Sequence, residues 1–246
     1  TLGGWIATRS GGHFATLYTH IDDFVESTTM VTPTGVIESR RLPGSGAGPS
    51  PDRMVIGSEG ILGVITEAWM RLQNRPIFRS SCSVEFDDYQ KALNATRLIS
   101  QSGLYPANCR LLDANEALFN GAGDGSKHLL ILSFESADHE LGTWLDRALE
   151  IASSAGGSYE KPQEKEPEAH RTGASGTWRN SFIRAPFNRD AAVRRGIIWD
   201  TFETSITWDH GFEFIESLKE KTRKAIHEIS GREPNVTCRL THTYPD

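Results

Sequence analysis

The spacing of hydrophobic residues changes near Ile77, and this change divides the chain in two. Before it, the pattern predicts strands with a turn at Thr32-Pro33-Thr34-Gly35 between the first two; these strands cover 24–32, 35–42 and 63–72. After it, apolar residues recur at helical spacing over 89–102, 139–154 and 211–230. We therefore expect one domain over 1–75 and another over 76–246, with the boundary at Arg75-Pro76.

The second part also predicts strands, at 81–86, 108–113, 128–135 and 235–243. Asp87-Asp88 precedes the helix of 89–102 as a cap, and Gly103 ends it. A short helix is expected over 115–119. Strands and helices in this order favour an α+β fold, with an antiparallel, ferredoxin-like sheet covered by helices on one face.

Three stretches predict no regular element. Residues 43–52 form a loop rich in Gly, Ser and Pro, and 160–176 are polar and indicate a mobile loop or linker. Residues 178–199 are aromatic and rich in arginine. We assign no helix or strand to any of the three.

Charge and composition exclude several classes of protein. The 246 residues carry 26 basic and 32 acidic side chains, a net charge of −6, which argues against a nucleic-acid partner. Cys82, Cys109 and Cys238 lack a metal-ligand spacing, and their odd number does not suggest a disulfide framework, so a reducing compartment fits best. No apolar run is long enough to span a bilayer.

Candidate chemistry begins with two segments of small residues. Gly57-Ser58-Glu59-Gly60-Ile61-Leu62-Gly63 is a glycine-rich turn before the apolar run 64–66, and glycine lets a backbone approach a ligand closely. The opening segment, 1–12, combines glycines and hydroxyl residues with Arg9. Its amides and its arginine could hold a pyrophosphate. Each segment alone could equally be a structural turn.

Together these segments resemble the FAD-binding domain of vanillyl-alcohol-oxidase-type flavoproteins. Further motifs make the chain most similar to the alkyldihydroxyacetonephosphate synthase branch; they stand at 1–5, 8–9, 30–38, 57–66, 110–113, 202–205, 208–209 and 238–244. The resemblance covers nearly the whole chain. It implies that 1–75 are the second half of an FAD-binding (PCMH-type) domain and 76–246 a truncated substrate or cap domain of the FAD-linked oxidase C-terminal type.

The resemblance implies FAD as a non-covalently bound cofactor. The residues expected to contact it are Thr1, Gly3, Gly4, Thr8, Arg9, Ser10, Gly11, Glu59, Gly60, Ile61, Leu62, Gly63, Val64 and Ile65. Glu59 could accept a hydrogen bond from a ribose hydroxyl, and the main chain of Ile65 could pair with the adenine edge. The alternative for Glu59 is a turn cap that bonds its own amides.

For catalysis the resemblance points to Tyr244 as the acid/base, against the alternative of a tyrosine that bridges core and solvent. Arg179 or Arg184 is expected to bind a substrate phosphate, because arginine offers a fork of donors. Arg189-Asp190 indicates a helix-start pair or a salt bridge. Arg110 is a further substrate-binding candidate; for it and for Arg239, catalytic support and a buried ion pair stay equally open.

Other catalytic classes find little support. His13, His20 and His242 lie near the flavin motifs, but the active-site histidines of the family belong to a segment after residue 246, so a loop histidine is the default for His13. No set of His, Cys, Asp and Glu has a metal-ligand spacing. Neither a Gly-x-Ser-x-Gly elbow nor a Walker loop is present.

The reaction implied by the resemblance exchanges the acyl group of acyl-dihydroxyacetone phosphate for a fatty alcohol, with the flavin as electrophile and no net redox change. The alternative is an FAD-dependent oxidase or dehydrogenase of a 2-hydroxy acid such as lactate or glycolate, because one fold supports both. The expected partner is thus a small lipid or hydroxy-acid substrate; a peripheral membrane contact and a homodimer stay open.

We read the chain as a fragment, because the first half of the FAD domain should precede Thr1 and the histidine-rich segment should follow Asp246. As it stands, it should bind FAD weakly or not at all and could serve only as a packed cap domain. The expected location is the bacterial cytoplasm or an organelle lumen such as the peroxisome.

Overall fold

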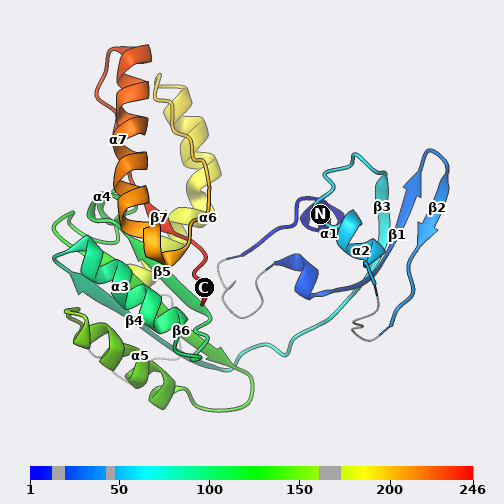
Figure 1. The fold of residues 1–246 in the computed structure, drawn as a ribbon, viewed down its shortest axis with the longest axis horizontal. Helices are drawn as coiled ribbons and strands as arrows, with labels where there is room; N and C mark the ends of the chain where they lie inside the picture. The colour runs from blue at the N-terminus through cyan, green and yellow to red at the C-terminus, as the bar shows by residue number, and fades with distance from the viewer. Residues whose placement is uncertain (13–19, 43–47, 161–172, 246) are drawn as a thin grey trace. The chain divides into compact units, whose positions relative to one another are not determined.

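The computed structural model describes residues 1–12, 20–42, 48–160 and 173–245 (Figure 1). Its internal contacts divide the chain into two compact units, Thr1–Arg75 and Pro76–Asp246.

The first unit is built on a three-stranded antiparallel sheet in the order β2-β1-β3. The strands are β1 (Val25–Thr32), β2 (Gly35–Glu38) and β3 (Val64–Met70). The pair Thr32↔Gly35 closes the hairpin at the turn expected from Pro33 and Gly35. The helices are α1 (Leu2–Ala7), the 3-10 turn η1 (Ile21–Asp23) and α2 (Pro51–Val55).

Both short α-helices differ from expectation. The opening segment forms α1, since the Thr1 side chain accepts a hydrogen bond from the Gly4 amide at 3.1 Å and caps the helix. The expected loop of 43–52 ends in α2, whose Asp52 accepts hydrogen bonds from the hydroxyls of Thr28 (2.7 Å) and Ser39 (2.5 Å). Residues 43–47 lie outside the described part of the chain.

The second unit contains a four-stranded antiparallel sheet in the order β4-β6-β5-β7. Its strands are β4 (Phe78–Phe86), β5 (Asn108–Leu112), β6 (His128–Ser136) and β7 (Arg239–Leu240). Its helices are α3 (Tyr89–Ser100), α4 (Ala114–Phe119), α5 (Gly142–Ser154), α6 (Gly173–Val193), the turn η3 (Trp208–His210) and α7 (Gly211–Ser230). β6 lies between β4 and β5, which gives the split β-α-β arrangement of ferredoxin-like folds. The expected α+β class is confirmed.

The two faces of this sheet differ in chemistry. The face under α3 and α5 is apolar and carries the main core, with rows such as Val84, Leu130 and Leu111 across three strands (Figure 1). The opposite face is mixed: it carries a row of polar side chains, Ser81, Ser133 and Asn108, at matching register positions, and a second buried apolar cluster that includes Leu112, Leu129 and Ile131. The alternation of each strand therefore separates the face of the main core from this mixed face.

Two expectations about the second unit were wrong. Residues 173–176 of the predicted linker belong to α6, which continues through most of the region left without an element; the linker residues 161–172 lie outside the described part of the chain. Apolar residues lie on all sides of α6, so its sequence shows no helical stripe. The strand expected over 235–243 pairs only at Arg239–Leu240, because side-chain contacts hold much of the rest.

Candidate functional site

The two glycine-rich segments of the first unit lie against each other. The Gly57 amide donates to the Ile6 carbonyl at 2.9 Å, and the Glu59 amide donates to the Ala7 carbonyl at 2.9 Å. The position of a β-carbon on Gly3 lies 3.6 Å from the Ile65 carbonyl oxygen. The fold thus brings together residues of 1–12 and 57–65 that the sequence predicted as flavin contacts.

The turn at 57–63 requires glycine. Gly60 has φ +85°, a left-handed conformation that glycine adopts without strain. A β-carbon on Gly63 would lie 2.4 Å from the Val31 carbonyl oxygen, so only glycine fits there. Glu59 is also left-handed, at φ 49°, and it is exposed. Its amide bonds Ala7 rather than its own side chain.

The surface formed by these segments suits a ligand that approaches main chain. Among the described residues, no atom lies within 4 Å of a β-carbon position on Gly60 or on Gly12, so nothing in that part of the chain covers either backbone. Ile61 and Val64, on the same turn and strand, are 85% and 68% exposed. Open backbone beside exposed apolar side chains fits the mixed polar and aromatic surface of FAD. The flavin contacts themselves stay predictions.

Arg9 and the hydroxyl residues of the opening segment have local partners. Arg9 forms an ion pair with the buried carboxylate of Asp22 at 3.1 Å, and Arg53 pairs with the same carboxylate. The Thr8 hydroxyl donates to the Gly4 carbonyl at 2.9 Å and lies 2.9 Å from the Ser10 hydroxyl. These contacts hold α1 in place, and the Arg9 side chain is still 57% exposed.

In the second unit, Arg110 is buried on the mixed face of the sheet, opposite the main core. Its residue is 1% exposed, its guanidinium lies 4.3 Å from the centre of the Trp178 ring, and its Nη2 donates to the Thr241 carbonyl at 3.4 Å. Burial and the neighbouring Arg239 lower the pKa of Arg110 to about 10. Arg110 is therefore a cation at neutral pH, held against the aromatic ring of Trp178, and the carboxylate of Glu203 acts in the opposite direction on its pKa.

Polar atoms beside Arg110 on this face have unused hydrogen-bonding capacity. Asn108 lies two residues before Arg110 on β5 and pairs in register with Ser133. Both residues are 8% exposed, and within the described parts of the chain Asn108 Oδ1 and Ser133 Oγ have no hydrogen-bond partner. Buried polar atoms seldom lack a hydrogen-bond partner, and functional sites are one place where such atoms are found.

Tyr244 is tethered through its main chain. Its carbonyl accepts a hydrogen bond from Trp208 Nε1 at 2.8 Å and one from the Ser100 hydroxyl at 3.1 Å. Its ring centre lies 6.3 Å from that of His242, and its hydroxyl oxygen is buried. One residue earlier, the Thr243 hydroxyl donates to the Cys109 carbonyl at 3.4 Å. These contacts fix the position of the predicted acid/base at the end of the segment.

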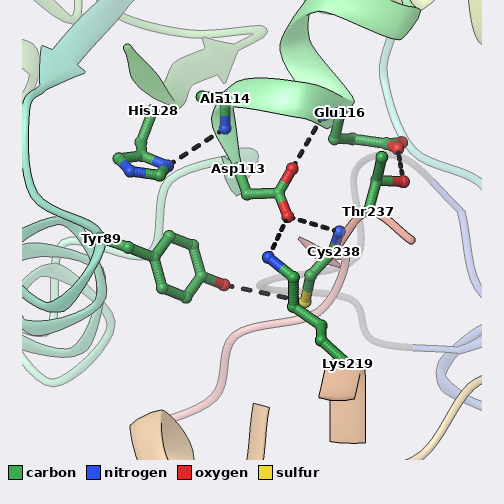
Figure 2. A network of polar contacts seen from close by, with 8 residues as sticks. All are labelled: Tyr89, Asp113, Ala114, Glu116, His128, Lys219, Thr237 and Cys238. Atoms are coloured by element: carbon green, nitrogen blue, oxygen red, sulfur yellow. Dashed lines mark hydrogen bonds and ion pairs between the residues drawn. The ribbon is translucent and has the colours of Figure 1, made fainter. Parts of the chain in front are cut away.

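A buried polar network, which the sequence did not predict, lies where this segment enters the sheet. Figure 2 shows Asp113 at its centre, accepting hydrogen bonds from the Glu116 amide, Lys219 Nζ and the Cys238 amide, each at 2.8 Å. Glu116 accepts from the Thr237 hydroxyl at 2.5 Å and from Arg239 at 2.9 Å. Arg239 thus pairs with a buried carboxylate while its own side chain stays 27% exposed, which favours the ion-pair role over the other role left open for it.

The other arginines named from the sequence, Arg179, Arg184 and Arg189, lie on α6. Arg184 is exposed on α6; Arg179 lies in the same helix, but its side chain is outside the described part of the structure. Arg189 pairs with Asp200 at 3.1 Å. It lies in the last turns of α6, so it does not begin a helix with Asp190. His13 lies outside the described residues.

The described residues contain neither a metal-binding cluster nor a membrane-spanning helix. Across 1–12, 20–42, 48–160 and 173–245, no group of three or more His, Cys, Asp or Glu could hold a metal ion. Over the same ranges, no helix is long and apolar enough to cross a membrane. Cys82, Cys109 and Cys238 are free thiols, and burial raises the pKa of Cys82 and of Cys109 to about 11.

Comparison with protein families places the chain in a class. The profile of FAD linked oxidases, C-terminal domain, matches residues 75–246. The match covers well over half of the sequence, so the chain belongs to this family. FAD is therefore the cofactor of its class, in agreement with the flavin-like motifs of the first unit.

Individual relatives give a finer comparison. The chain is 29% identical over 262 residues to the alkyldihydroxyacetonephosphate synthase of Dictyostelium discoideum, covering 99% of this chain and 42% of that protein. It is 36% identical over 115 residues to the mitochondrial D-lactate dehydrogenase [cytochrome] of Arabidopsis thaliana, covering 46% of this chain and 20% of that protein. A solved alkyldihydroxyacetonephosphate synthase structure matches all of this chain and 49% of its own, with a TM-score of 0.75 and 25% identity. The chain spans less than half the length of these relatives.

Proposed function

We propose that this chain is part of an FAD-dependent enzyme that exchanges the acyl group of acyl-dihydroxyacetone phosphate for a fatty alcohol. The observation that carries the proposal is the extent of the similarity: synthase relatives match along 99% of the chain, whereas the dehydrogenase match covers 46%. A solved synthase structure matches the whole chain, including the segment of β7 and Tyr244.

In this proposal the first unit contributes to FAD binding through its two adjoining segments, Thr1–Gly11 and Glu59–Ile65. The glycine turn offers close backbone approach, and Arg9 offers a cation whose exposed side supports a contact with phosphate. FAD, when bound, supplies the electrophile, and the exchange proceeds without net redox change.

The second unit contributes the groups that act on substrate. Arg110 is a buried cation on the mixed sheet face, which supports a role in holding a substrate oxyanion. Tyr244 moves a proton; its fixed main chain supports this role, since an acid/base must be held in place. Arg184 or Arg179 contributes a second contact to the phosphate.

Product analysis tests the proposal. The whole protein, loaded with FAD, is incubated with palmitoyl-dihydroxyacetone phosphate and hexadecanol, and fatty acid and ether lipid are measured. Equal amounts of both products are expected. Tyr244→Phe should lower the rate at least roughly 100-fold, as expected for loss of an acid/base. Release of fatty acid without ether lipid would contradict the exchange reaction.

The second candidate is an FAD-linked oxidoreductase of a 2-hydroxy acid. The specific observation in its favour is the higher identity of the dehydrogenase match, 36% over 115 residues. Arg110 could hold a carboxylate as well as a phosphate, because both present oxygens to the guanidinium fork.

A further inference from the structure

The segment that carries Tyr244 has little backbone pairing of its own. β7 comprises two residues, which pair as Leu112↔Arg239 and Leu111↔Leu240. Arg239 lies on the mixed face of the sheet and Leu240 packs against the main apolar core on the other face. A slip of one residue would exchange these two side chains between faces.

Two buried carboxylates hold this segment at its entry. Asp113 accepts the Cys238 amide through its side chain, while the Asp113 amide donates to the Cys238 carbonyl at 3.0 Å. Glu116, one helical turn later, accepts from the residues on either side of Cys238, namely Thr237 and Arg239. Three consecutive residues are therefore each bonded to one of the two carboxylates, as Figure 2 shows for Thr237 and Cys238.

The carboxylates themselves are rigidly placed. Asp113 is 2% exposed and caps α4 through the Glu116 amide, and Lys219 of α7 pairs with its second oxygen. The Ala114 amide, also at the start of α4, donates to His128 Nδ1 at 3.1 Å. The start of α4 is thus bonded to β6 and α7 as well as to β7.

We propose that Asp113 and Glu116 are positioning residues that set the register of Thr237–Tyr244 against β5, and with it the location of Tyr244. This inference rests on the proposed function only for the role of Tyr244. A slip of one residue would move Tyr244 by about 3.3 Å along the strand. Displacements smaller than this lower catalytic rates strongly, since reacting groups must meet within a narrow range of distance.

Two kinds of variant test the proposal. Glu116→Gln replaces one of the two carboxylates, Asp113 and Glu116, with a neutral amide. Thr237→Val removes the hydroxyl that donates to Glu116, whereas Thr237→Ser keeps that hydroxyl. The control is Glu135→Gln, which removes an ion pair with Arg79 between β4 and β6; Arg79 is about as buried as Arg239, whereas the Glu135 side chain, 20% exposed, is less buried than that of Glu116, which is 6% exposed. Thr237→Val changes a single half-buried side chain, so it keeps the test valid if Glu116→Gln fails to fold.

The first measurement uses the whole protein, loaded with FAD, with palmitoyl-dihydroxyacetone phosphate and hexadecanol. We expect Glu116→Gln and Thr237→Val to lower kcat per bound flavin roughly 10- to 100-fold with KM changed less than about threefold. Thr237→Ser should restore the rate, and Glu135→Gln should leave kcat unchanged. Equal kcat in Thr237→Val and wild type would overturn the proposal.

The second measurement does not depend on activity. Hydrogen–deuterium exchange of the peptide covering 236–245 should be faster in Glu116→Gln and Thr237→Val, while exchange of 128–136 stays at the wild-type rate. Faster exchange across the whole unit would show a general loss of stability and overturn the positioning role. If the wild type lacks exchange activity but this local effect is present, the proposed function fails and the register role stands.

Discussion

The guanidinium of Arg110 lies 4.3 Å from the centre of the Trp178 ring, and both residues are 1% exposed. The contact joins β5 to α6, two elements far apart in the sequence. The negative face of the ring compensates part of the cost of burying the cation, because such contacts strengthen when water is excluded. Trp178 therefore makes a buried arginine tolerable on this sheet face.

Replacing Trp178 should consequently weaken the second unit. We expect Trp178→Leu to lower the free energy of unfolding by roughly 2–4 kcal/mol, from lost burial and the lost cation–π contact. Trp178→Phe keeps an aromatic face and should cost roughly half as much. Urea denaturation followed by circular dichroism measures both, and equal losses in the two variants would argue against an aromatic role.

The contribution of Lys219 to the free energy of unfolding should depend on its ion pair with Asp113. Its side chain is 15% exposed and that of Asp113 is 3% exposed, so the pair is largely shielded from water. Lys219→Met leaves a buried carboxylate without its cation and should cost roughly 3–5 kcal/mol. The double variant Lys219→Met/Asp113→Asn should recover part of that loss, as measured by a double-mutant cycle in urea; strictly additive losses would show that the two residues do not interact.

His128 should make stability fall in mild acid. Burial lowers the pKa of His128 below its ordinary value of 6.5, and its Nδ1 accepts the Ala114 amide, which requires the neutral ring. Between the folded-state pKa and 6.5 the unfolded chain binds more protons, so this contribution is present above pH 6.5 and is lost as pH falls through the folded value.

The comparison of pH 7.5 with pH 5 tests this prediction. His128→Asn keeps an acceptor for Ala114 and cannot be protonated, so its free energy of unfolding should fall less than that of the wild type. His139→Asn, at an exposed histidine, serves as control and should behave as the wild type does. An identical pH dependence in His128→Asn and wild type would disprove the assignment.

The glycine turn of the first unit should tolerate no side chain at Gly63. A methyl group there would meet the Val31 carbonyl at 2.4 Å, so Gly63→Ala should lower the free energy of unfolding by roughly 1–3 kcal/mol. Gly12→Ala, which meets no atom within 4 Å, is the matched control. Thermal unfolding of both variants measures the difference; equal melting temperatures would contradict the close packing of β3 against β1.

The sequence predicted those elements whose signals are local. α7 was expected with its observed bounds, because Gly211–Ser230 combines a helical apolar face with exposed charges. α3 was found to within two residues because Asp88 caps it, accepting the Lys91 amide at 2.8 Å. The first-unit hairpin followed from Pro33 and Gly35 for the same reason.

Features that depend on distant residues were missed. Nothing near Asp113 in the sequence indicates that Lys219 and Cys238, more than 100 residues later, bond its carboxylate. Trp178 stood in an aromatic stretch without periodicity, so its place over Arg110 could not be predicted. Arg110 was selected by resemblance, and its burial became visible only in the fold.

We propose that this chain serves a flavoenzyme without net redox turnover, and an anaerobic titration of the whole FAD-loaded protein tests this proposal most directly. Lactate, glycolate and palmitoyl-dihydroxyacetone phosphate are added in turn while the visible absorbance of the flavin is followed. We predict a spectral change only with the phosphate ester, together with release of fatty acid. Bleaching of the flavin by lactate or glycolate would contradict the claim and make the protein a hydroxy-acid dehydrogenase.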